Sequence, residues 1–154
     1  RGERRELAQL GIGQGRLTAT PLHLAMLTAA IARDGRMFRP RLAEAEPPQE
    51  LPRLFRAATA RRVAAAMRHA VVSGTGRGAD LPGLEVCGKT GTAQNPGGED
   101  HAWFVCFAPR ERPKLAVAVI VENAGFGSTA ALPVAVAVLQ RNAELEAQRA
   151  KEAP

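Results

Sequence analysis

Three short apolar runs separated by two turns constrain the fold of this chain more than any other feature. The runs cover residues 84–94, 101–108 and 115–122 of the 154-residue sequence, and each has the pattern of a β-strand. The turns at 95–100 and 109–114 are too short for the crossover that joins parallel strands, which takes about a dozen residues or more. The spacing therefore predicts an antiparallel meander.

Helical signals precede the predicted strands. Residues 7–19 are rich in glycine and are predicted to form a structured loop. Thr20 followed by Pro21 is typical of a helix start, and Gly35 is typical of a helix end. The segment between them is apolar on nearly every side, which predicts a deeply buried helix with Met26 in the core.

Prolines and apolar spacing divide the remainder of the chain. The four prolines within residues 37–56 prevent long regular structure there, although a short extended piece fits 39–43. Apolar residues spaced four apart predict a helix over 57–72, and the glycines of 73–79 predict a loop after it. A last helix is predicted over 130–148, packed on the sheet through its apolar start.

Together these elements predict an α/β fold of the α+β type, in which helices pack on an antiparallel sheet. Residues 1–142 are expected to form one folded portion, and 143–154 a charged tail that frays. The longest apolar stretches fall well short of the roughly 20 residues that span a bilayer. Because the chain opens with Arg1 and a charged segment, we expect that any targeting segment has been removed or was never present.

Composition disfavours several functional classes. The net charge is +6, and 18 of the 21 basic residues are arginines scattered along the chain. Aromatic residues make up only 4% of the sequence and tyrosine is absent, which leaves little for stacking on bases, so nucleic acid is not an expected partner. The two cysteines and three widely separated histidines lack metal-ligand spacing, so no metal or cofactor is expected.

One motif has the spacing of a nucleotide-binding loop. Gly83 and the Gly-Lys-Thr sequence at 88–90 match the P-loop pattern. A P-loop also needs an apolar strand before its first glycine and a helix that begins at its lysine. Residues 77–82 do not form such a strand, and the proline and glycines of 95–98 cannot begin a helix. Nucleotide binding stays an alternative that the flanking residues disfavour.

The same Lys-Thr-Gly sequence suits a strand that lines a cleft for an anion. The Lys89 ammonium supplies positive charge, and the Thr90 hydroxyl supplies a hydrogen-bond donor for a carboxylate. Gly91 lets a ligand approach the backbone, and an N–H beyond it can point at a developing oxyanion. Because successive side chains alternate between faces, Lys89 and Thr90 can contact one ligand only where the strand is an edge or twists.

Four segments, taken together, carry a family resemblance: 11–25 (GIGQGRLTATPLHLA), 74–76 (GTG), 88–94 (GKTGTAQ) and 101–109 (HAWFVCFAP). Their types and order resemble the C-terminal part of the transpeptidase domain of penicillin-binding proteins, most of all the class B enzymes. The resemblance covers residues 11–139. It implies a fragment of the fold that these domains share with serine β-lactamases.

The family has three active-site motifs, and this chain contains one of them. The resemblance implies that Ser-x-x-Lys holds the nucleophile and its base, that Ser-x-Asn assists proton transfer, and that Lys-Thr-Gly completes the site. Neither Ser73 nor Ser128 begins a Ser-x-x-Lys or Ser-x-Asn sequence. The chain is therefore predicted to be a fragment that is inactive alone, with the other two motifs in an N-terminal remainder.

The resemblance also implies roles for individual residues. Lys89 would hydrogen-bond the serine of the absent Ser-x-Asn motif and supply positive potential. Thr90, Gly91 and Thr92 would line the substrate site, with the two threonines binding the carboxylate of the substrate or β-lactam. The Thr92 N–H would be one catalytic donor to the oxyanion.

At the level of the whole protein, the resemblance implies a D,D-transpeptidase that cross-links D-Ala-D-Ala stem peptides through a serine acyl-enzyme and binds β-lactams. Expected partners are those ligands, the rest of the transpeptidase domain and other cell-wall synthesis proteins. The implied location is the extracytoplasmic face of the cytoplasmic membrane, with an anchor outside this chain. A non-catalytic interaction module of the same fold is the alternative. Transpeptidase or carboxypeptidase outcome, and a role in elongation, division or sporulation, stay open.

Other conspicuous residues are interpreted as structural. His101, at the predicted start of a strand, is one of them. Cys87 and Cys106 are expected to be two buried thiols rather than a strained cross-strand disulfide. The aromatic residues of the second apolar run are expected in the sheet core: Trp103, Phe104 and Phe107.

Overall fold

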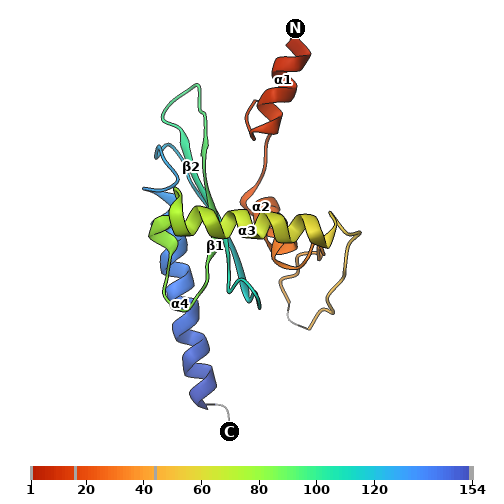
Figure 1. Cartoon of the computed structure of the whole chain (residues 1–154), viewed down its shortest axis with the longest axis vertical. Coiled ribbons are helices and arrows are strands. Elements are labelled where there is room, and N and C mark those ends of the chain that lie inside the picture. Colours follow the sequence, from red (N-terminus) through yellow and green to blue (C-terminus); the bar gives the residue numbers. More distant parts are fainter. Residues whose placement is uncertain (1, 16, 44, 153–154) are drawn as a thin grey trace.

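A computed structural model of the chain describes residues 2–15, 17–43 and 45–152 (Figure 1). The helices and the strands occur in separate runs along the chain, as expected for an α+β protein. The helical elements are α1 (Gly2–Gly11), α2 (Pro21–Ala32), α3 (Ala57–Ser73), the short 3₁₀ helix η1 (Arg77–Ala79) and α4 (Ala131–Glu152). The strands are β1 (Cys87–Ala93), β2 (His101–Ala108) and β3 (Leu115–Val121).

The described strands form an antiparallel sheet in the order β1-β2-β3, which confirms the predicted meander. Thr90 of β1 lies opposite Phe104 of β2, which in turn lies opposite Val119 of β3. At the start of β2, the His101 Nδ1 accepts a hydrogen bond from the Asn123 N–H at 3.0 Å. This bond ties the start of β2 to the end of β3, so the structural interpretation of His101 is confirmed.

Two extended segments differ from the prediction. The first strand begins at Cys87, later than predicted, because Glu85 adopts a left-handed φ of 42° that a regular strand does not contain. No strand is formed by the extended piece predicted at 39–43, and the nearest pairing is an isolated bridge between Phe38 and Glu50. The prolines on both sides of that bridge explain why it does not lengthen.

Helices cover both faces of the sheet. On one face, Phe104 is fully buried in a cluster that includes Leu132 and Leu139 of α4. On the opposite face, Phe107 is fully buried in a second cluster with Met67 of α3. Figure 1 shows α3 crossing the sheet and α4 on the other side of it. Because successive side chains of β2 point to opposite faces of the sheet, this strand contributes to two different cores.

The ends of α2 are set by the residues that the sequence singled out. The Thr20 hydroxyl accepts a hydrogen bond from the His23 N–H at 3.2 Å, which is an N-cap. At the other end the Gly35 N–H donates to the Ala30 carbonyl at 2.7 Å. Asp34 and Gly35 both have positive φ values, 55° and 84°, which turn the chain out of the helix. The predicted start and end of this helix are confirmed.

The predicted deep burial of α2 is wrong. Only Thr28 and Ala30 of this helix are buried, and Met26 is half-buried. Leu22 and Leu27 remain 54% and 37% exposed. The reason is that α2 packs through one side against the sheet and α3, while no element of the described chain covers its other side. The helix therefore has more apolar surface than the described fold buries.

The glycine-rich segment begins later than predicted. Residues 7–11 belong to α1, and only the described residues after them are loop. The preceding residues, with Arg, Glu, Leu, Ala and Gln, are good helix formers, so the helix continues until glycine appears at Gly11. Figure 1 shows that α1 extends away from the sheet.

The later helices are longer than predicted. Helix α3 confirms the prediction at 57–72 but includes Ser73, and η1 forms inside the predicted loop. The described part of the tail is helical, since α4 continues to Glu152; residues 153–154 lie outside the described residues. Its final turns are rich in Ala, Glu, Gln and Arg, and Lys114 holds Glu146 at 2.5 Å. Over the described residues, no helix has both the length and the apolarity to span a bilayer.

Both cysteines are free and buried, as predicted. Cys87 lies in the core shared with α3, whereas Cys106 lies in the core shared with α4, because the register pairs Cys106 with Gly88. Burial raises the pKa of the Cys87 thiol to about 11. Burial likewise raises the pKa of the Cys106 thiol to about 12. Both thiols are therefore protonated and unreactive at neutral pH.

This burial predicts how the protein responds to alkylation and to alkaline pH. At pH 8, iodoacetamide should modify Cys87 and Cys106 only after unfolding, as followed by mass spectrometry of the two peptides. Because the folded-state pKa values lie above the ordinary 9.0, the unfolded chain loses its thiol protons first as pH rises. Stability should therefore fall between about pH 9 and pH 12. Rapid modification of the folded protein would contradict this prediction.

Candidate functional site

The predicted Lys-Thr-Gly site lies on β1, which is one of the two edge strands of the described sheet. Lys89 is exposed, and its Nζ donates a hydrogen bond to the Thr90 carbonyl at 2.7 Å. Residues 87–93 run as one continuous strand, so no helix begins at Lys89. The strand geometry therefore does not support the P-loop alternative, and the edge position is the one in which Lys89 and Thr90 can share a ligand.

Hydrogen bonds from outside the ladder identify which backbone groups face the open edge of β1, the side away from β2. Three carbonyls at even-numbered positions accept them: Arg68 Nη1 donates to Val86, just before β1, at 3.0 Å, Lys89 Nζ to Thr90 at 2.7 Å and Gln14 Nε2 to Thr92 at 3.0 Å. In an antiparallel strand the N–H and C=O of one residue point to the same side. The N–H groups of Thr90 and Thr92 therefore also face the open edge.

Thr75 is a site residue that sequence reasoning did not assign. Its Oγ1 lies 2.6 Å from the Thr90 Oγ1, so the two hydroxyls share a hydrogen bond. Gly74 and Gly76 both donate through their N–H groups to the Ala70 carbonyl, at 3.1 and 3.0 Å, which wraps the chain tightly around the end of α3. This turn places Thr75 against β1. The Gly-Thr-Gly sequence was the available signal.

Gly127, in the loop before α4, packs closely against the backbone of β1 and β2. A Cβ built there would lie 2.1 Å from the Trp103 carbonyl oxygen and 2.6 Å from that of Gly91, so this position has no room for a side chain. Gly91 is tight as well, since its own Cβ would lie 3.2 Å from that of Trp103. Trp103, predicted in the core, is half-buried. Glycine at 91 therefore also relieves crowding between β1 and β2.

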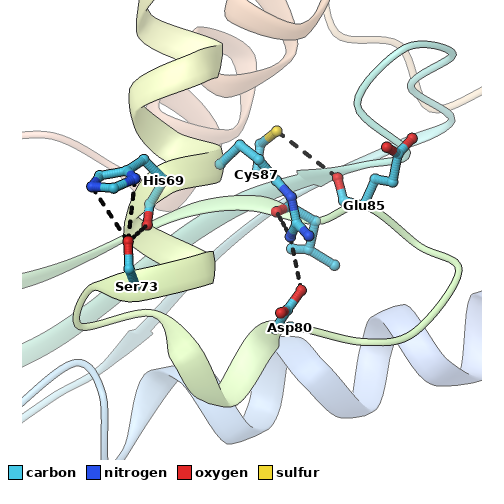
Figure 2. Close-up of polar contacts among 7 residues, drawn as sticks. His69, Ser73, Asp80, Glu85 and Cys87 are labelled. Carbon is cyan, nitrogen blue, oxygen red and sulfur yellow. Dashed lines mark hydrogen bonds and ion pairs between the residues drawn. The ribbon is translucent and has the colours of Figure 1, made fainter.

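The surroundings of Ser73 argue against a role as a nucleophile. Its Oγ lies 3.2 Å from the His69 Nδ1 and also donates to the His69 carbonyl at 3.2 Å (Figure 2). Both residues are exposed on one face of α3. Asp80 cannot complete a triad, because its carboxylate pairs with Arg68 at 2.9 Å. The pair is a local contact at the end of a helix.

A cavity of about 1,120 Å³ lies at the opposite end of the sheet, against Phe107 and the turn between β2 and β3. Its lining is rich in arginine, but carboxylates already neutralise much of this charge. Arg61 makes two hydrogen bonds to Asp34, at 3.0 and 2.9 Å, and this contact lowers the pKa of the Asp34 carboxyl. Further pairs are Arg36–Glu50, Lys114–Glu146 and Arg110–Glu111. The Arg61–Asp34 pair ties the segment that follows α2 to α3, and the Arg36–Glu50 pair ties that segment to Glu50.

The family profile described as penicillin binding protein transpeptidase domain matches residues 4–140. Among curated proteins, the peptidoglycan D,D-transpeptidase MrdA of Haemophilus influenzae is 39% identical over 84% of this chain and 24% of its own length. PbpA of Mycolicibacterium smegmatis, also a peptidoglycan D,D-transpeptidase, is 36% identical over 77% of this chain and 27% of its own length.

The chain is also similar to solved structures of penicillin-binding proteins. Pseudomonas aeruginosa PBP2 in complex with WCK 5153 is 40% identical, with a TM-score of 0.78 over 92% of this chain and 36% of that one. The ceftriaxone acyl-enzyme complex of penicillin-binding protein A from M. tuberculosis is 30% identical, with a TM-score of 0.81 over 87% of this chain and 34% of that one. The chain spans about a quarter of the length of the curated relatives it matches. It belongs to the penicillin-binding protein transpeptidase domain family.

Proposed function

We propose that this chain forms one wall of the acyl-transfer site of a peptidoglycan D,D-transpeptidase that binds β-lactams. The observation that carries the proposal is the open edge of β1. There an exposed lysine, the Thr90 hydroxyl and two outward N–H groups lie along one strand, and the Thr75 hydroxyl from the turn after α3 bonds to that of Thr90. The names of the relatives, and the acyl-enzyme complex of one of them, support this reaction class.

Each residue has a proposed part in the chemistry. Lys89 supplies positive potential for the substrate carboxylate and a hydrogen bond to a serine outside this chain. The hydroxyls of Thr90 and Thr92 bind that carboxylate. The Thr92 N–H stabilises the oxyanion that forms when a serine attacks the carbonyl carbon; the loss of such a donor typically costs about 2.7–4 kcal/mol of transition-state stabilisation.

The nucleophile and its base come from a part of the protein outside this chain. The proposed substrates are D-Ala-D-Ala stem peptides, and the rest of the transpeptidase domain is the direct partner. A membrane anchor outside the chain would hold this domain at the extracytoplasmic face of the membrane. Neither Ser73 nor Ser128 stands in a nucleophile motif, so the isolated chain is proposed to be inactive.

Covalent labelling tests the proposal. A fluorescent penicillin should label the full-length protein and should not label the 154-residue chain, as read on a denaturing gel and by mass spectrometry. Heat-denatured full-length protein is the control for non-specific reaction. Labelling of the isolated chain at Ser73 or Ser128 would contradict the assignment. A folded full-length protein that is never labelled would instead be a non-catalytic module of the same fold.

A further inference from the structure

Gln14 stands at a helix end whose geometry is fixed by two hydrogen bonds. The Gly13 N–H donates to the Leu10 carbonyl at 3.0 Å, and the Gln14 N–H donates to the Gln9 carbonyl at 2.8 Å. With Gly13 at φ = 76°, this is the paired pattern that ends many helices at a left-handed glycine. Gly15 follows at φ = 81°, so Gln14 projects from a turn that only glycines form readily.

The side chain of Gln14 reaches the candidate site. Its Nε2 donates to the Thr92 carbonyl at 3.0 Å, across 78 positions of sequence, and the residue is half-buried. That carbonyl faces the open edge, on the same side as the Thr92 N–H. Anchoring the carbonyl restricts rotation of the backbone at Thr92. It therefore restricts the direction in which the adjacent N–H can point.

We infer that Gln14 is a positioning residue, which holds Thr92 so that its N–H stays directed at the developing oxyanion. The inference rests on the proposed function. Gln14 acts through the strand and need not touch the substrate. Since a displaced donor weakens an interaction made in the transition state, the loss should appear in the acylation step rather than in the first binding of the ligand.

The test uses the full-length protein and its reaction with a labelled penicillin. Gln14→Glu keeps the shape of the side chain, but an ionised carboxylate cannot donate a hydrogen bond to a carbonyl. Its acylation rate constant should fall about ten- to a hundredfold, less than or comparable to the loss of a whole oxyanion donor, while the dissociation constant of the initial complex changes less than about threefold. Gln140→Glu, on the exposed surface of α4, is the matched control and should behave as wild type.

Two further measurements separate positioning from general stability. Gln14→Lys restores a donor and should recover part of the acylation rate. In the acyl-enzyme of Gln14→Glu, the ester carbonyl stretch should move to higher wavenumber than in the wild type, because a weaker oxyanion contact polarises the carbonyl less.

Three results would count against this inference. A wild-type acylation rate in Gln14→Glu would overturn it. A parallel loss of initial binding and acylation, without rescue by Gln14→Lys and without a carbonyl shift, would show a structural role instead. Absence of labelling in the wild-type protein would overturn the proposed function, and this inference with it.

Discussion

Replacing Lys89 by alanine is expected to slow β-lactam acylation of the full-length protein by about ten- to a hundredfold. A hydrogen bond to a charged group contributes about 1.5–3 kcal/mol, and each 1.4 kcal/mol corresponds to about a factor of ten. The Lys89 side chain is exposed on the open edge of β1, so its removal should leave the sheet intact. The time course of fluorescent-penicillin labelling measures the effect.

Lys151→Ala provides the matched control for that experiment. Lys151 is exposed in the last turn of α4, far along the chain from the edge strand, and its removal should not change the labelling rate. Equal rates for wild type and Lys89→Ala would remove Lys89 from the proposed site. If Lys89→Ala and Lys151→Ala unfold at the same temperature, a loss of fold cannot explain a difference between their labelling rates.

The second large effect is on stability. Phe104→Ala is expected to lower the free energy of unfolding by about 3–5 kcal/mol, because it empties a fully buried position between β1 and α4. The ring fills the space beside Gly88, where an added Cβ would lie only 2.6 Å from it. Urea denaturation measures the loss.

Phe126→Ala is the control, since Phe126 is 68% exposed and its truncation should change stability by less than about 0.5 kcal/mol. Similar losses in the two variants would contradict the placement of Phe104 in the core.

The meander was predictable because its signals are local. Short turns permit only antiparallel neighbours, and the β2 range was predicted residue for residue. The burial of α2 was not predictable from its sequence. An apolar helix side, such as the one that carries Leu22, does not reveal whether another segment of the chain packs against it. The start of β1 was missed for a similar reason, because the positive φ of Glu85 has no sequence signal comparable to glycine.

The candidate site divides in the same way. Lys89, Thr90, Gly91 and Thr92 could be named because they adjoin one another in a motif, and their roles stay proposals. The contact from Gln14 spans 78 positions, and no pattern within either segment states that the two meet. The glycines around position 14 predicted a structured loop, but they did not indicate that Gln14 contacts Thr92.

The exposed ammonium of Lys89 has a consequence for solubility. An unpaired strand edge is a template on which other polypeptides can form intermolecular sheets, and a lysine there is one of the devices that proteins use against such self-association. A strand that must receive a ligand cannot be protected by covering it. The residue proposed to attract an anion would therefore also act as a gatekeeper, so its loss should make the protein more prone to aggregate at high concentration.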